Sequence, residues 1–147
     1  MLKKTNTMKK DMDNPTYCLY CNEQQLLIIA KCLEAWSRRY AGQLNLTYDT
    51  ALQERLDVRS QGNIQTYCRL RNEIEKHLKV IYFLLFPELY PNGSYSYNAD
   101  NTIGNAYQIY RTILHKLAIE HNKDNVYSTP PLPSGNLGKV LVERLCI

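Results

Sequence analysis

The stretch AYQIYRTILHKLA, residues 106–118, decides the fold class because two helical stripes run through it. Its apolar residues recur three or four positions apart, the spacing that places side chains on one face of an α-helix: Ala106, Ile109, Ile113 and Leu117. Tyr107, Arg111 and His115 form a second stripe, each four residues from the next. The first stripe predicts a helix packed on a core. The second is either the solvated flank of that helix or a surface that holds a flat, negatively charged ligand.

Patterns elsewhere extend the helical prediction. We expect a helix at 102–120 around the quoted stretch, and three others at 23–44, 48–56 and 64–86. Asn22 is suited to cap the first of these, and Pro87 cannot continue the third. The sequence therefore predicts a mainly α fold, a small helical bundle with a long helical hairpin. Short strands at 126–128 and 139–145 would add a minor β element near the C-terminus.

Composition places the chain among small globular proteins. Its 147 residues are 44% hydrophobic and 22% charged. Residues 1–16 are polar and rich in lysine, which predicts a flexible leader before one helical domain at 17–147. The longest apolar run, VIYFLLF at 80–86, is much shorter than the roughly 20 residues of a membrane span. Five cysteines without a secretion signal favour reduced thiols, so we expect a cytoplasmic protein, in a host cell, with no membrane association.

No pattern of catalytic residues stands out. The sequence lacks Gly-x-Ser-x-Gly, the phosphate-binding glycine loops and His-Glu-x-x-His, so we expect no catalytic residue, no cofactor and no enzyme activity. Cys18 and Cys21 have the spacing of a metal or redox pair. No second pair accompanies them, which favours two small buried side chains at a helix entry, and no metal site is expected.

Basic and aromatic side chains are the stronger candidates for a site. The chain has a net charge of +4 and twelve tyrosines, a residue type common at contact surfaces. Arg71 interrupts an apolar seam, where it must pair with a carboxylate, such as Glu75 or Glu34, or open onto a site. Arginine grips phosphate and aromatic rings stack on a base. The combination predicts a nucleotide pocket lined by Arg39, Gln43, Arg71, Tyr95, Tyr97, Tyr107, Arg111 and His115.

Four stretches together resemble a family of small phage proteins: WSRRYAGQL, FPELYPNGSYSYN, AYQIYRTILHKLA and PPLPS. The family patterns are Ser-Arg-x-x-x-Gly-Gln, matched at 37–43, and Tyr-x-Ile-Tyr-x-x-Ile-x-His, matched at 107–115. The resemblance covers roughly residues 24–143. It implies a non-enzymatic anti-defence protein, since one class of such proteins sequesters the signalling nucleotides of immune systems such as Thoeris and CBASS. Those sponges are homo-oligomers with aromatic and arginine side chains in their pockets.

Three functions remain open at this point. The first is a homo-oligomeric protein that captures a small phosphorylated nucleotide, a cyclic dinucleotide or an ADP-ribose derivative. The second is an inhibitor or adaptor that binds a host protein through two segments, the tyrosine-rich loop expected at residues 87–105 and the proline-rich segment PPLPS at residues 130–134. The third, a nucleic-acid-binding regulator, is disfavoured because the positive charge is dilute.

Overall fold

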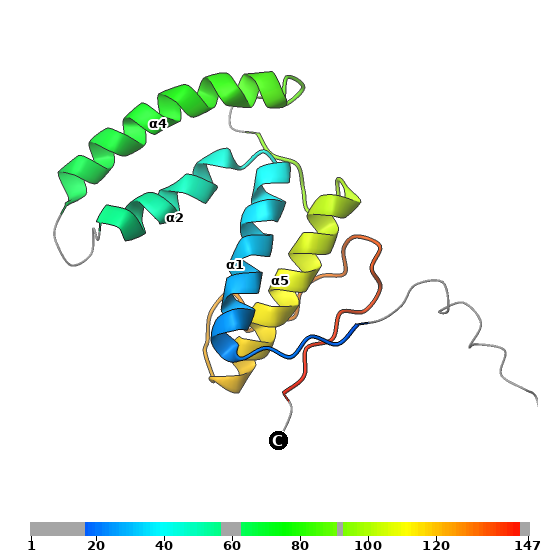
Figure 1. Cartoon of the computed structure of the whole chain (residues 1–147). Coiled ribbons are helices and arrows are strands. Elements are labelled where there is room, and N and C mark those ends of the chain that lie inside the picture. The colour runs from blue at the N-terminus through cyan, green and yellow to red at the C-terminus, as the bar shows by residue number, and fades with distance from the viewer. Residues whose placement is uncertain (1–16, 57–62, 91–92, 145–147) are drawn as a thin grey trace, which may run out of the picture.

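The computed structural model describes residues 17–56, 63–90 and 93–144, and these residues form four helices (Figure 1). They are α1 (Glu23–Tyr40), α2 (Leu44–Leu56), α4 (Ile64–Leu85) and α5 (Asn101–Glu120). The mainly α prediction is confirmed, whereas the leader at 1–16 lies outside the described residues. No helix in the described ranges is long and apolar enough to cross a membrane.

Helices α1 and α5 pack antiparallel and hold the apolar core (Figure 1). The cluster at its centre consists of Ala30 from α1 with Tyr110, Ile113 and Leu117 from α5. At one end of the pair, the Ser37 hydroxyl donates to the Ile103 carbonyl at 3.2 Å. The apolar stripe of 106–117 is thus the face of α5 that meets α1, as its spacing predicts.

Helix α1 begins where the sequence indicates and ends earlier. Asn22 and Gln25 form a reciprocal capping box at its start. The helix stops at Tyr40 rather than at 44, because Gly42 adopts a φ of +82° and turns the chain into α2. Trp36 follows Leu33 by three residues and Tyr40 follows Trp36 by four, a spacing that predicts a buried seam. Both rings are instead exposed and lie against each other with centroids 4.9 Å apart.

Helices α2 and α4 form a second antiparallel unit that extends away from the α1–α5 pair (Figure 1). Helix α4 ends at Leu85, directly before Phe86 and Pro87, as predicted. Its buried residues are Tyr67 and Tyr82. Ile81 and Leu85 continue the apolar spacing of Leu78, which predicts that they are buried. Both are exposed, because the inward face of α4 follows Tyr82 and Phe86.

The C-terminal segment, residues 126–144, lies along α5 without forming a strand. The predicted strands at 126–128 and 139–145 are therefore not found in the described part of the chain, and residues 145–147 lie outside it. Hydrogen bonds from side chains of α5 fix this segment, where pairing with a neighbouring strand was expected. Gln108 donates to the Gly138 carbonyl at 2.7 Å, and the Asn105 amide exchanges hydrogen bonds with Asn136.

Candidate functional site

Arg111 and His115, two members of the predicted stripe on α5, contact the chain's own C-terminal segment. Arg111 Nη2 donates to the Val126 carbonyl at 3.0 Å, and its guanidinium carbon lies 5.0 Å from the centre of the Tyr127 ring. His115 Nδ1 lies 2.8 Å from the Tyr127 carbonyl oxygen, which can only accept, so this nitrogen is the donor. Arg111 and His115 therefore bind the Tyr127 ring and the carbonyl groups of Val126 and Tyr127, where the sequence predicted an external ligand.

Two predicted site residues do meet on α5. The rings of Tyr97 and Tyr107 stack, with centroids 4.7 Å apart and planes 17° from parallel. Tyr107 also meets the edge of Tyr110, a core residue that the sequence reading passed over. Burial raises the pKa of Tyr110 to about 12. The three rings fix the start of α5 against the loop that precedes it.

Arg71 lies in the α2–α4 unit, where carboxylates neutralise it. Its Nε donates to Glu75 Oε1 at 3.1 Å and lies 3.8 Å from Asp49 Oδ1. The nearby charge of Glu75 raises the pKa of Arg71 above its ordinary value. The Tyr67 hydroxyl donates to Asp49 as well, and Gln53 donates to both of these side chains. Of the two partners considered for Arg71, the structure shows Glu75. Glu34 instead binds Arg38.

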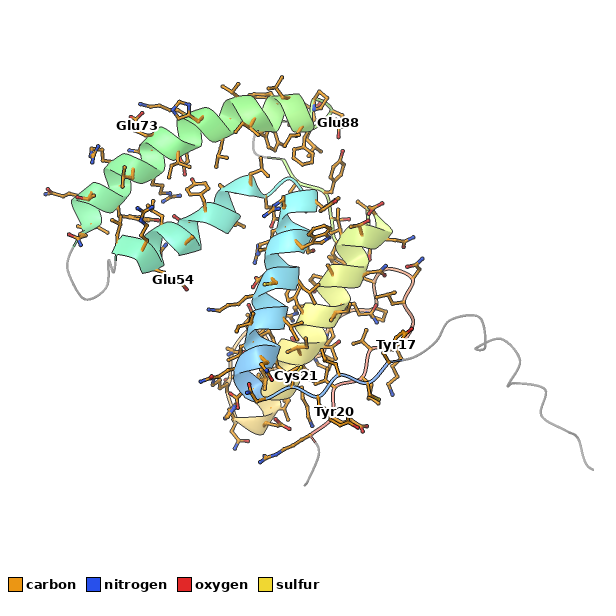
Figure 2. All side chains as sticks on the ribbon, in the orientation of Figure 1. Tyr17, Tyr20, Cys21, Glu54, Glu73 and Glu88 are labelled. Carbon is orange, nitrogen blue, oxygen red and sulfur yellow. The ribbon has the colours of Figure 1, made fainter. Side chains whose placement is uncertain are left out.

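Gln43 and Tyr95 stand near each other at the end of α1. Gln43 accepts from Arg38 Nη1 at 3.0 Å, and its Nε2 lies 3.4 Å from the Ser94 hydroxyl oxygen. The Tyr95 amide donates to the Ala41 carbonyl at 2.9 Å. Its hydroxyl donates to Glu88, at the end of α4 (Figure 2), which raises the pKa of Tyr95 and lowers that of Glu88. Arg39 lies exposed in the last turn of α1.

A cavity of about 710 Å³ opens where α1, α2, α4 and the tyrosine-rich loop meet. Residues from three separate stretches line it: Gly42, Gln43, Leu44, Asn45 and Leu46; Glu75, Leu78, Lys79, Tyr82 and Phe83; Gly93 and Ser94. Gly42 is required here, because its φ is positive and a Cβ atom would lie 3.3 Å from Leu89 Cδ1. The Tyr82 hydroxyl lies within 3.0 Å of the Tyr90 and Gly93 carbonyls and so positions the loop.

The lining of this cavity combines an apolar wall with polar groups. Leu78, Tyr82 and Phe83 provide apolar and aromatic surface. Lys79 brings a positive charge, and helix α2 begins at the cavity with Leu44. The first amides of a helix have no partner within it and carry partial positive charge, so they favour anions. Glu75 supplies the opposite charge and would accept from hydroxyl or amino groups.

Comparison with protein-family profiles, with curated proteins and with solved structures finds no match to this chain.

The structure distributes the eight predicted residues over several places. Only Gln43 lines the cavity. Tyr97, Tyr107, Arg111 and His115 lie on α5 or on the segments packed against it. Arg71 lies on α4, where its side chain is 45% exposed and pairs with Glu75. The sequence prediction does not include Lys79 and Phe83, which lie eight and four residues before Pro87. The sequence shows that Lys79 precedes the apolar run 80–86 and that Phe83 lies within it. It does not show that both residues line one cavity with Gly42 and Ser94.

The cysteine pair at 18 and 21 does not assemble a metal centre in the described part of the chain. Cys18 and Cys21 are free thiols, the first exposed and the second half-buried at the start of α1 (Figure 2). Within 17–56, 63–90 and 93–144, no group of three or more His, Cys, Asp or Glu side chains could hold a metal ion.

Proposed function

We propose that this protein binds a small phosphorylated nucleotide, without chemical conversion, in the cavity between α2, α4 and the tyrosine-rich loop. The observation that carries the proposal is the cavity itself. Its volume of about 710 Å³ falls inside the range of roughly 300 to 1,000 Å³ that is typical of small-molecule sites. Sites of this kind join apolar walls to polar groups that fix the ligand. Here the apolar wall is formed by residues such as Leu78 and Phe83, and polar and charged groups make up a nearly equal share of the lining.

The lining suits the separate parts of a nucleotide. Phe83 and Tyr82 offer aromatic surface to a base. Lys79 and the first amides of α2 attract phosphate. Gln43 and Ser94 offer an amide and a hydroxyl for hydrogen bonds to a base edge or a ribose. Compared with the arginines that the sequence suggested, Lys79 is the better placed cation for this cavity.

The resemblance to small phage proteins narrows the class of ligand. It favours the signalling nucleotides of bacterial anti-phage immunity, such as cyclic dinucleotides and ADP-ribose derivatives, over metabolic nucleotides. A protein that sequesters such a signal needs only affinity and abundance. We accordingly propose an anti-defence sponge that acts in the cytoplasm of the infected cell.

Thermal melting with a ligand panel tests the proposal. Cyclic dinucleotides, cyclic ADP-ribose isomers and ATP are added to the purified chain, and a true ligand at a hundred times its dissociation constant stabilises by about 2.7 kcal/mol. Lys79→Ala should abolish most of that gain. Lys76→Ala is the matched control, because Lys76 lies on the same helix, is exposed and pairs with Glu73 outside the cavity. A panel without any shift, or equal losses in the two variants, contradicts the proposal.

A second function, a protein-binding inhibitor or adaptor, is favoured by a different observation. Tyr90 in the tyrosine-rich loop is 87% exposed, and Leu132 in the segment PPLPS is 57% exposed. Exposed aromatic and proline-flanked apolar side chains suit docking to another protein. A stoichiometric host protein that is retained after nuclease and phosphatase treatment, and lost in Tyr90→Ser, would support this function instead.

A further inference from the structure

The outer face of α4 changes from polar to apolar along the helix. Glu73 lies on the side of α4 that faces away from α2 (Figure 2). Val80 follows after seven residues and Leu84 after four more, so helical geometry places both on that same outer face. Val80 is 62% exposed and Leu84 is 77% exposed. Among the described helices, α4 packs mainly against α2, which covers the opposite side.

Neighbouring positions enlarge this face into a patch. We call it the α4 patch, and its members, 45% to 77% exposed, are Val80, Ile81, Phe83, Leu84 and Leu85. A helical stretch that is apolar on nearly all sides is normally buried. Five such side chains present on the order of 500 Å² of apolar surface, and contiguous patches above a few hundred Å² mark interaction sites.

We propose that the α4 patch is the interface of a two-fold dimer, in which α4 packs antiparallel against α4 of a second copy of this chain. A single helix presents a ridged, rounded surface, which packs best into the grooves of another helix. A second copy supplies an identical apolar helix, and a two-fold axis buries both patches at once. The two patches together present about 1,000 Å² of apolar surface, close to the lower limit of the area that a specific interface buries.

The dimer would also bear on the cavity. Phe83 belongs to the α4 patch and also lines the cavity. A second copy packed on Phe83 would fix this ring and cover part of the surface beside the cavity. Dimer formation and nucleotide binding should then stabilise each other. Only this coupling rests on the proposed function; the dimer itself does not.

Sedimentation velocity of the full chain over a wide concentration range tests the dimer. The wild type should sediment with twice the 17.2 kDa mass of one chain. Leu84→Glu and Val80→Glu should each halve the apparent mass, because each would bury an unpaired carboxylate in an apolar interface. The matched control is Ile28→Glu on α1, since Ile28 is 62% exposed and lies outside the patch. Circular dichroism should show the same helicity in all four proteins.

Three results would overturn the dimer: a monomeric wild type, an assembly that Leu84→Glu and Val80→Glu leave intact, or an equal loss of mass in Ile28→Glu. Flotation with phosphatidylglycerol vesicles adds one more test. A wild type that is monomeric and floats with vesicles, where Leu84→Glu does not, would assign the patch to a lipid surface. If the wild type is a Leu84-dependent dimer but no nucleotide binds, the dimer stands and the proposed function fails.

Discussion

The α1–α5 pair and the α2–α4 unit are both antiparallel helix pairs, but they bury different kinds of side chain. Between α1 and α5 lie aliphatic groups and one tyrosine, with Ile113 and Leu117 at the centre. Between α2 and α4, the buried ring of Tyr67 joins the partly exposed side chains of Asp49 and Arg71 in a polar network. Apolar burial stabilises a helix pair without further partners, whereas ion pairs with exposed side chains contribute little.

This difference assigns separate roles to the two regions. The α1–α5 pair, with the C-terminal segment laid along it, forms the stable part of the molecule. The α2–α4 unit has fewer buried apolar contacts and carries both the cavity wall and the α4 patch. Regions of low local stability are the ones that supply binding surfaces and move on binding. We expect α2 and α4 to exchange their amide hydrogens faster than α1 and α5.

The largest effect should come from an isoleucine in the core pair. Ile113→Ala should destabilise the protein by about 2 to 5 kcal/mol, because Ile113 is 4% exposed and its removal leaves a cavity. Ile81→Ala in the α2–α4 unit is the control, since Ile81 is exposed. Urea unfolding of the two variants, each made in the Leu84→Glu background, measures both losses. If both variants lost the same free energy of unfolding, the proposed difference in apolar burial between the α1–α5 pair and the α2–α4 unit would be wrong.

The next effect concerns the contact between α5 and the C-terminal segment. A Cβ atom on Gly104 would lie 2.5 Å from the Gly135 backbone nitrogen, so Gly104→Ala must displace the segment. We expect a loss of about 1 to 3 kcal/mol, as for other overpacked sites. Ser134→Ala removes only the 2.9 Å hydrogen bond to the Gly104 carbonyl and should cost about 1 kcal/mol. A harmless Gly104→Ala would show that the segment is not packed there.

Alkaline pH should weaken the core pair through Tyr110. The folded pKa of Tyr110, about 12, lies above the ordinary value of 10 because of burial. The folded protein therefore holds this proton more tightly, so the associated stability is complete below pH 10 and is lost as the pH rises toward 12. Between neutral pH and pH 11, the wild type should lose about 1 kcal/mol of unfolding free energy through Tyr110. Tyr110→Phe should not show this loss. Tyr90→Phe, at an exposed tyrosine, should change nothing.

The smallest effect is predicted for the polar seam of the α2–α4 unit. Tyr67→Phe removes the hydroxyl that donates to Asp49 and accepts from Gln53. The expected loss is about 0.5 to 1.5 kcal/mol, and it should appear as faster amide exchange in α2 and α4 rather than in α5. Faster exchange throughout the molecule would mean that the two regions unfold as one.

The sequence predicts the local features of this fold well. The cap at Asn22, the helix end before Pro87 and the core face of α5 all follow from rules that act within a few residues. The early end of α1 at Gly42 does not, because a glycine in a helical pattern is compatible with continuation as well as with a turn.

Long-range features were much less accessible. Helical periodicity places Arg111 and His115 on one face of α5. It does not reveal that residues 126–127 of the same chain lie against that face. The cavity joins Gly42, Lys79 and Ser94, which are far apart in the sequence, so no local pattern links them. For Arg71, the i+4 spacing suggests Glu75 as the ion-pair partner, which the structure shows. The spacing alone does not decide between Glu75 and Glu34.

Hydrogen exchange with and without the nucleotide that gives the largest melting shift tests the central claim most directly. If the ligand occupies the cavity, added protection should appear in residues 42–46 and 78–83, and α5 should change little. Protection centred on residues 107–115 and 126–127 would contradict the account, since the ligand would then have displaced the C-terminal segment from Arg111 and His115.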